Sequence, residues 1–145
     1  MKLCVDSNVL FTFFWPNSVF STIASQPLLS LTSPIYALEE IDRHASIIRE
    51  KTQLSLTQFV ERKNELAKMI ELVPLNDYQS ALKEVLKRLP KNSGKDFLEF
   101  SNDADFLALA YQKKIPLWSN DALLKKQSVV TVFSTKEIIE LLAGQ

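Results

Sequence analysis

Residues 2–10 have the sequence Lys-Leu-Cys-Val-Asp-Ser-Asn-Val-Leu, in which an apolar run is followed directly by an acid. The short apolar run from Lys2 to Val5 ends at Asp6, which predicts a buried strand that closes on a carboxylate. Further short apolar runs bounded by turn residues occur along the chain. They predict strands at Leu28–Leu31, Leu72–Leu75, Ile115–Trp118 and Val129–Phe133.

Helical patterns separate these predicted strands. Apolar residues three or four positions apart predict helices at Ile35–Lys51, Leu56–Ile70, Tyr78–Leu89 and Asp103–Gln112, and a short helix at Ala122–Lys126. Lys91–Lys95 is the best loop candidate because Asn, Ser and Gly follow one another there. The alternation predicts an α/β fold, with helices on both faces of a parallel sheet. No repeat or linker interrupts it, so we expect a single domain over residues 1–145.

The composition is that of an ordinary globular protein. The chain is 46% hydrophobic and 23% charged, which suffices for one core and differs from a disordered segment. The apolar stretch Val9–Phe14 is far shorter than the ~20 residues of a membrane-spanning helix, and no secretory signal is evident at the N-terminus. Cys4 is the only cysteine, which excludes an internal disulfide and fits a cytoplasmic location.

Several enzyme classes are excluded by the residues that the chain lacks. Gly94 and Gly144 are the only glycines, so neither a phosphate-binding loop nor a dinucleotide fingerprint is present. His44 is the only histidine and no Gly-x-Ser-x-Gly motif accompanies it, which argues against a Ser-His-Asp hydrolase. His44 lies one helical turn after Glu40 and could reach the edge of a site there, but a plain surface residue is the preferred interpretation. Carboxylates are plentiful and become the candidates for chemistry.

Three aspartates are expected at one edge of the sheet. Asp6 ends the first strand, Asp121 follows the strand that ends at Trp118, and Asp103 opens a helix. Each aspartate alone also fits a helix N-cap, which satisfies free backbone N–H groups. Because the carboxyl ends of parallel strands meet at one edge, the coincidence of all three favours a functional site.

Helical geometry selects among neighbouring acids, since each residue advances ~100° around the helix. Asp103 shares a stripe with the apolar residues of its helix, whereas Asp105 projects to nearly the opposite side and is expected to act as a capping-box-like carboxylate. In the preceding helical segment, Glu40 flanks the buried face and Glu39 points to solvent. Glu40 is therefore the preferred site residue, with Glu39 left open as the alternative.

Four carboxylates in one place repel one another unless one is protonated or a divalent cation lies between them. A ligand set made of oxygen atoms alone suits Mg²⁺ or Mn²⁺, and magnesium in proteins commonly binds substrate phosphates as well. The pattern thus indicates phosphodiester hydrolysis, with either one or two ions.

Four segments resemble the acidic motifs of the PIN-domain family, in the same order. They are Val5-Asp6-Ser7-Asn8-Val9-Leu10, Leu38-Glu39-Glu40-Ile41, Asp103-Ala104-Asp105-Phe106-Leu107-Ala108-Leu109-Ala110 and Leu117-Trp118-Ser119-Asn120-Asp121. The chain is most similar to compact prokaryotic PIN proteins such as the VapC-type toxins. This resemblance implies a three-layer α/β/α sandwich and an Mg²⁺- or Mn²⁺-dependent endoribonuclease that cuts RNA. It also implies the toxin of a toxin-antitoxin pair, with an antitoxin protein as partner, and a homodimer.

The resemblance also assigns roles to residues. Asp6, Glu40, Asp103 and Asp121 match the catalytic and metal-binding acids of the family. Asn8 and Ser119 match polar residues that support these acids. Ser7 stands where the family usually has threonine, which keeps a hydroxyl at that position.

The charge balance permits RNA binding without demanding it. The formal charge is 17 minus 17, or zero, but neutralising the four site carboxylates leaves 17 minus 13, or four excess positive charges. The basic residues that could follow a phosphate backbone are Lys83, Lys87, Arg88, Lys91, Lys95, Lys113, Lys114, Lys125 and Lys126. A solvated helix face is an equally good interpretation of these residues. The aromatic residues Phe13, Phe14, Trp15 and Phe20 follow the first motif, where their rings could stack on bases or contact a partner, but most of them are expected in the core.

Other function classes fit less well. A catalytically silent PIN-like module that binds RNA or protein is the main alternative, although the presence of all four acids argues against it. A receiver-type phosphoacceptor domain needs a paired acid after the first strand, where the sequence supplies Asp6 alone. A haloacid-dehalogenase-type phosphatase needs an aspartate where Asn8 stands.

Overall fold

The computed structural model describes residues 1–91 and 100–144. In chain order its elements are β1 (Lys2–Val5), α1 (Ser7–Phe11), the 3₁₀ helix η1 (Thr12–Phe14), α2 (Val19–Ala24), β2 (Ser30–Pro34), α3 (Tyr36–Arg43), α4 (Ala45–Thr52), α5 (Leu56–Met69), β3 (Glu71–Val73), the 3₁₀ helix η2 (Leu75–Asp77), α6 (Gln79–Arg88), α8 (Ala104–Lys113), β4 (Leu117–Trp118), the 3₁₀ helix η3 (Ala122–Lys126), β5 (Val132–Phe133) and α9 (Thr135–Ala143). No helix in these two ranges is long and apolar enough to cross a membrane.

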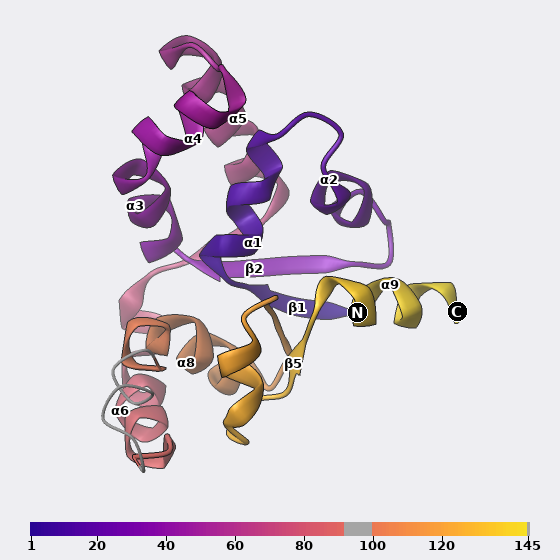
Figure 1. The fold of residues 1–145 in the computed structure, drawn as a ribbon. Helices are drawn as coiled ribbons and strands as arrows, with labels where there is room; N and C mark the ends of the chain where they lie inside the picture. Colours follow the sequence, from indigo (N-terminus) through magenta and orange to yellow (C-terminus); the bar gives the residue numbers. More distant parts are fainter. Residues whose placement is uncertain (92–99, 145) are drawn as a thin grey trace.

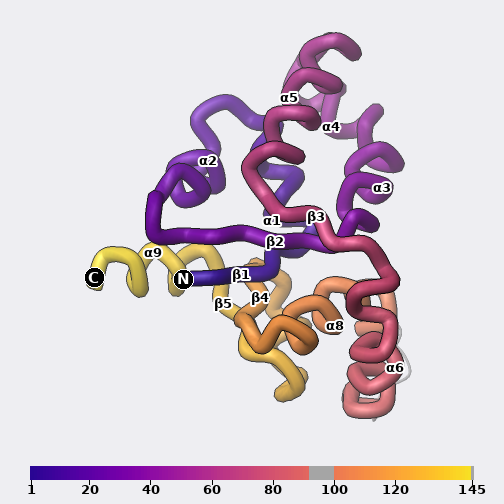
Figure 2. The backbone as a smooth tube through the Cα atoms, turned by 180° about the vertical axis from the view of Figure 1, so that it is seen from behind, coloured from indigo at the N-terminus to yellow at the C-terminus, as the bar shows by residue number. Residues whose placement is uncertain are grey.

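The five strands form one parallel sheet in the order β3-β2-β1-β4-β5. Helices α1 to α5 lie on one face and α6 with α8 on the other, as Figures 1 and 2 show from opposite sides. The predicted α/β sandwich with a central parallel sheet is confirmed. After β1 the chain adds β2 and β3 on one side, then crosses to place β4 and β5 on the other. The neighbours β1 and β4 therefore mark the topological switch point, outside which open α/β sheets bind ligands.

Helix α8 is the most deeply buried helix segment around this switch point. Its residues from Phe106 to Ala110 are all buried, and it packs between α6 and the strands β1, β2 and β4. Aromatic side chains fill the opposite side of the sheet, where Phe20 stacks on Trp118 with ring centroids 5.3 Å apart. Phe13, Phe14 and Phe20 are buried, as the sequence predicts.

The second strand lies later in the chain than predicted. It was expected at Leu28–Leu31, but β2 covers Ser30–Pro34 and Leu28 is 69% exposed. Thr32 and Ser33 are turn formers by composition, yet here both are buried within the strand. Their hydroxyls donate to backbone carbonyls, at 2.9 Å from Ser33 to Val5, which removes the cost of burying them.

The remaining boundaries differ by small amounts and for local reasons. The predicted helix Ile35–Lys51 is two helices, because the backbone leaves the helical conformation at His44 between α3 and α4. Strand β3 ends before Pro74, and β4 and β5 are shorter than predicted. Helices α1, α2 and α9 were not predicted; the first two have only five and six residues. The predicted loop Lys91–Lys95 lies, apart from Lys91, outside the described residues.

A buried glutamine holds the segment between η3 and β5. The Gln127 Nε2 donates to the carbonyls of Leu124 (2.7 Å) and Val130 (2.8 Å). Its Oε1 accepts from the backbone N–H groups of Val129 (2.9 Å) and Val130 (3.0 Å). One side chain therefore satisfies four backbone groups in a segment without regular structure, as buried polar groups require.

We predict that Gln127→Ala lowers the free energy of unfolding by about 2–4 kcal/mol, because it leaves buried backbone groups unpaired. Urea unfolding measures this directly. The matched control is Gln112→Ala, at an exposed position of α8, where a change within about 0.5 kcal/mol is expected. Equal stability of the two variants would show that Gln127 does not hold this segment.

Candidate active site at the carboxyl edge of the sheet

Asp6 is a buried carboxylate at the switch point. It follows β1 directly, is only 3% exposed, and is the N-cap of α1. Its Oδ1 accepts the Val9 backbone N–H at 2.9 Å, and its Oδ2 accepts the hydroxyl of Ser119. The Asn8 backbone N–H also hydrogen-bonds this carboxylate, whereas the Asn8 side chain is exposed. Both oxygens of Asp6 are thus oriented by the folded chain.

Ser119 joins the ends of β1 and β4. It lies directly after β4 and is buried, and besides donating to Asp6 its Oγ accepts the Asp121 backbone N–H at 3.1 Å. The Asp6 backbone N–H donates to the Trp118 carbonyl at 3.1 Å. Asp121 is the N-cap of η3 and accepts the Leu123 N–H at 3.0 Å. The motif around Asp121 is therefore fixed against the motif around Asp6.

Glu40 reaches the same place from α3. It is partly buried, and the buried hydroxyl of Ser7 donates to its carboxylate. The charges of Arg43 and His44 also act on it. Glu39, one position earlier, is exposed and lines a different cleft. The structure thus places Glu40, and not Glu39, beside Asp6.

Asp103 is at the N-cap position of α8, where its side chain makes no capping bond to the helix. Because α8 leads directly into the start of β4, its first turn lies at the carboxyl edge, at the same end of the sheet as α3 (Figure 1). The capping-box role predicted for Asp105 is wrong. Its carboxylate accepts the Tyr78 hydroxyl at 2.6 Å, so it faces α6 instead of the start of its own helix.

The electrostatics of this edge disfavour ionised carboxylates. Burial raises the pKa of Asp6, and the charge of Asp121 raises it further, while the hydrogen bonds from Ser119 and Val9 oppose the rise. Burial also raises the pKa of Glu40, with a smaller contribution from Asp6, while Ser7, Arg43 and His44 lower it. Asp6 therefore interacts with both Asp121 and Glu40, and a cation between them would relieve the repulsion.

The side chains of Asp6, Glu40, Ser7 and Ser119 offer carboxylate and hydroxyl oxygens, which are the ligand atoms that a hard divalent cation prefers. As the side chains are placed, however, no three His, Cys, Asp or Glu residues within 1–91 and 100–144 are close enough together to hold an ion. Pairs are formed, Asp6 with Asp121 and Asp6 with Glu40. A shared ion therefore requires these side chains to move toward it.

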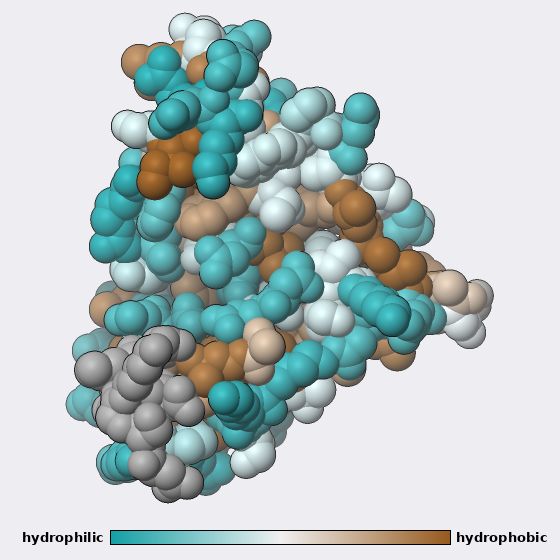
Figure 3. Space-filling model, viewed as in Figure 1, coloured by the Kyte–Doolittle hydropathy of each residue, from teal (hydrophilic) through white to brown (hydrophobic). Residues whose placement is uncertain are grey.

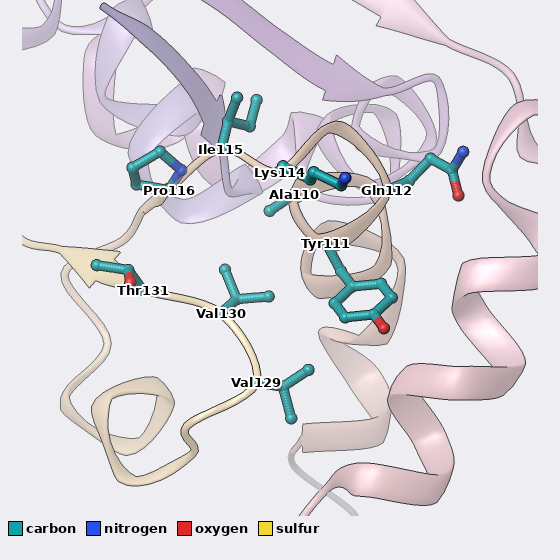
Figure 4. Close-up of a pocket in the computed structure, with 9 residues that line it drawn as sticks. All are labelled: Ala110, Tyr111, Gln112, Lys114, Ile115, Pro116, Val129, Val130 and Thr131. Carbon is teal, nitrogen blue, oxygen red and sulfur yellow. The ribbon is translucent and has the colours of Figure 1, made fainter.

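A cavity of about 600 Å³ lies elsewhere, between the end of α8 and the segment before β5 (Figure 4). Its lining residues include Tyr111, Ile115 and Val130, and none of them is acidic. Because α8 ends and β4 begins there, this cavity is at the amino edge of the sheet. It is separate from the carboxylates.

Sequence reasoning missed two contributors to the acidic edge. In the sequence Ser7 stands out only as a serine in place of the usual threonine, but its hydroxyl donates a hydrogen bond to Glu40. Arg43 was not considered; it lies three residues after Glu40 on α3, which puts it on the same helix face, and this spacing could have identified it.

Comparison with known proteins agrees with this architecture. A family model described as PIN domain matches residues 4–142. Among solved structures, the chain is similar to VapBC2 from Rickettsia felis bound to a DNA fragment from their promoter, with a TM-score of 0.63 and 11% identity. The match covers 92% of this chain and 98% of that chain, and at this identity it shows the fold. No curated protein sequence matches.

We predict that Asp6→Asn stabilises the metal-free protein by about 1 kcal/mol at pH 7, as removal of an unfavourable functional group commonly does. A carboxyl whose pKa is raised on folding favours the folded state while protonated and loses this contribution as pH rises through the folded pKa. The advantage of Asp6→Asn should thus shrink as pH falls through the raised folded pKa, and it should be gone by pH ~4, near the unfolded pKa of aspartate.

Urea unfolding in EDTA between about pH 3.5 and 8 tests this expectation, because this interval spans the pKa values of carboxyl groups. Asp77→Asn, at an exposed position in η2, is the matched control and should not change the pH dependence. A wild type that is more stable than Asp6→Asn at neutral pH without metal would contradict the raised pKa.

Proposed function

We propose that this chain, which belongs to the PIN-domain family, is a metal-dependent endoribonuclease that hydrolyses RNA phosphodiester bonds. The observation that carries the proposal is the buried Asp6 carboxylate at the switch point, held by Ser119 and facing the charges of Asp121 and Glu40. A buried acid with a raised pKa beside further acids is typical of a functional site. The domain extends over residues 1–145 in this proposal.

Asp6, Glu40, Asp103 and Asp121 are the residues that would hold Mg²⁺ or Mn²⁺. When bound, such an ion polarises a phosphoryl oxygen and lowers the pKa of a bound water. Ser119 keeps Asp6 and the backbone of Asp121 in register.

The Ser7 hydroxyl donates a hydrogen bond to the Glu40 carboxylate and so orients it. Hydroxyl groups that fix ligand carboxylates commonly influence metal affinity as strongly as a weak ligand does.

Basic residues beside the Asp121 turn support an RNA substrate. Lys125 and Lys126 lie in η3, the turn that Asp121 begins. Lys87 and Lys91 lie farther away, at the end of α6 where Arg88 covers the Tyr111 ring. Lysines near an acidic site can follow the phosphate backbone on both sides of the bond to be cut. With the acids neutralised by metal, the rest of the chain has the excess positive charge that such binding needs.

We further propose that the protein is the toxin of a toxin-antitoxin pair, with an antitoxin protein as partner. The similar Rickettsia felis structure is itself a VapBC2 assembly. Ile47 on α4 is 51% exposed, and Leu56 and Val60 on α5 are 59% and 41% exposed. Figure 3 shows apolar surface in this region, which suits contact with a partner chain. Homodimer formation and a cytoplasmic location are part of the same proposal.

A catalytically silent PIN-like module that binds RNA or protein is the second candidate. One observation favours it: within the described residues the carboxylates are not gathered into a group of three that could hold an ion as placed. Metal-dependent cleavage separates the two functions, because a silent module cuts nothing.

We predict that the purified protein cuts a pool of single-stranded RNAs with Mg²⁺ or Mn²⁺ and that EDTA abolishes the cutting. Asp6→Asn and Glu40→Gln should each lower the cleavage rate by at least about 100-fold, because each removes a carboxylate from the proposed metal site. Cleaved ends are measured by gel and by sequencing.

The control is Glu61→Gln, an exposed acid on α5, which should cut at the wild-type rate. Circular dichroism verifies that each variant is folded. Metal-independent cutting, or equal rates in Asp6→Asn and wild type, would contradict the proposed function. Absence of cutting on every RNA would favour the silent module.

A further inference from the structure

A small cleft of about 250 Å³ opens beside the acidic edge. Its walls come from the start of α3, the segment after β3 and the first turn of α8: Ile35, Tyr36, Glu39, Pro74, Leu75, Tyr78 and Asp105. Pro34 ends β2 and Val73 ends β3, so the cleft is at the carboxyl end of these two strands. It therefore shares an edge of the sheet with Asp6.

Helix α3 connects the cleft to the acidic edge. Glu39 lines the cleft and the next residue, Glu40, faces Asp6. One turn further on, the Arg43 Nη2 donates to the Tyr36 hydroxyl at 2.9 Å, and its charge also acts on Glu40. A ligand in the cleft would thus lie within one or two helical turns of the proposed catalytic carboxylates.

The cleft combines hydrogen-bond acceptors with apolar walls. The Asp105 carboxylate is held in place by the hydroxyl of the buried Tyr78, and Glu39 is an exposed carboxylate. Among the other lining residues, Leu75 is 46% and Ile35 42% exposed, although both are large apolar side chains. A flat ring with N–H groups on one edge would cover the apolar wall and donate to the carboxylates. The cleft is smaller than the ~300 Å³ lower limit of drug-sized ligand pockets, which suits a single ring system.

We propose that this cleft is a nucleobase subsite, which holds a base next to the phosphodiester bond that is cut and selects bases with an exocyclic amino group. The inference rests on the proposed nuclease function and names the substrate preference of that site. Cytosine, adenine and guanine each present an amino group that a carboxylate can accept, whereas uracil presents carbonyl oxygens in its place.

The surroundings favour a base over a basic side chain of a protein partner. The Arg43 guanidinium lies over the Tyr36 ring at 5.3 Å from its centroid, so a fixed cation already borders the cleft. Arg43 would attract the phosphate attached to a nucleotide, which a basic side chain lacks, while the base donates to the Glu39 and Asp105 carboxylates. The exposed Leu75 also suits the face of a ring better than an ammonium group.

Sequencing of the ends cut from a random-sequence RNA pool tests this inference. For the wild type, we expect uridine to be disfavoured at least about fivefold at one position flanking the cut, as loss of a base hydrogen bond produces. In a Glu39→Gln, Asp105→Asn double variant the preference should fall below about twofold, since side-chain amides can donate to uracil. Leu75→Trp, which fills the cleft from an exposed position, should also abolish it. Glu61→Gln should keep the wild-type preference.

A second measurement does not depend on cleavage. In NMR titrations of the folded protein, CMP should shift the backbone amide signals of Tyr36 and Leu75, and UMP should shift them at least about tenfold more weakly. If the wild type cuts nothing but CMP binds in this way, the nuclease function fails and the subsite stands. Cutting with an unchanged preference in both cleft variants, or displacement of these signals by N-acetyl-arginine amide but not by CMP, would overturn the subsite.

Discussion

The hydrogen bond from Ser119 to Asp6 is the interaction on which the acidic edge depends. The two residues are 113 positions apart in the chain and meet only because β1 and β4 are neighbours in the sheet. The same serine accepts the backbone N–H of Asp121, so one hydroxyl sets two carboxylates relative to each other. The order of the strands thus determines where the acids lie relative to each other, and the chain must fold completely before they can act together.

The candidate acids have structural roles as well as the proposed chemical one. Asp6 caps α1 and Asp121 caps η3, and each occupies the junction where a strand gives way to a helical turn. Such a junction supplies free N–H groups that favour a carboxylate. Burial acts in the opposite direction for Asp6 and raises its pKa. The fold therefore tolerates a strained electrostatic arrangement at one edge, which is common at functional sites and is balanced by the apolar core around α8.

The sequence was sufficient to predict the fold class, the parallel sheet and the positions of Asp6 and Asp121. An error of a few residues in a predicted strand boundary still leaves the acid that follows the strand at the same edge of the sheet. It was not sufficient for β2, whose buried Thr32 and Ser33 look like turn residues until their bonds to neighbouring strands are known. Helical geometry placed Glu40 correctly beside Asp6 but misjudged Asp105, since its partner Tyr78 comes from another element. Contacts between distant segments, such as the one from Ser7 to Glu40, have no local signal.

The proposed function requires the carboxyl edge of the sheet to bind a divalent cation through its acids. Paramagnetic broadening of backbone NMR signals by Mn²⁺ tests it most directly, since the effect falls steeply with distance from the ion. Low Mn²⁺ concentrations should broaden the signals of Ser7 and Ser119 first, while that of Ile115 at the amino edge stays sharp, and Asp6→Asn should remove this selectivity. Broadening centred away from Ser7 and Ser119, or equal broadening in wild type and Asp6→Asn, would contradict it.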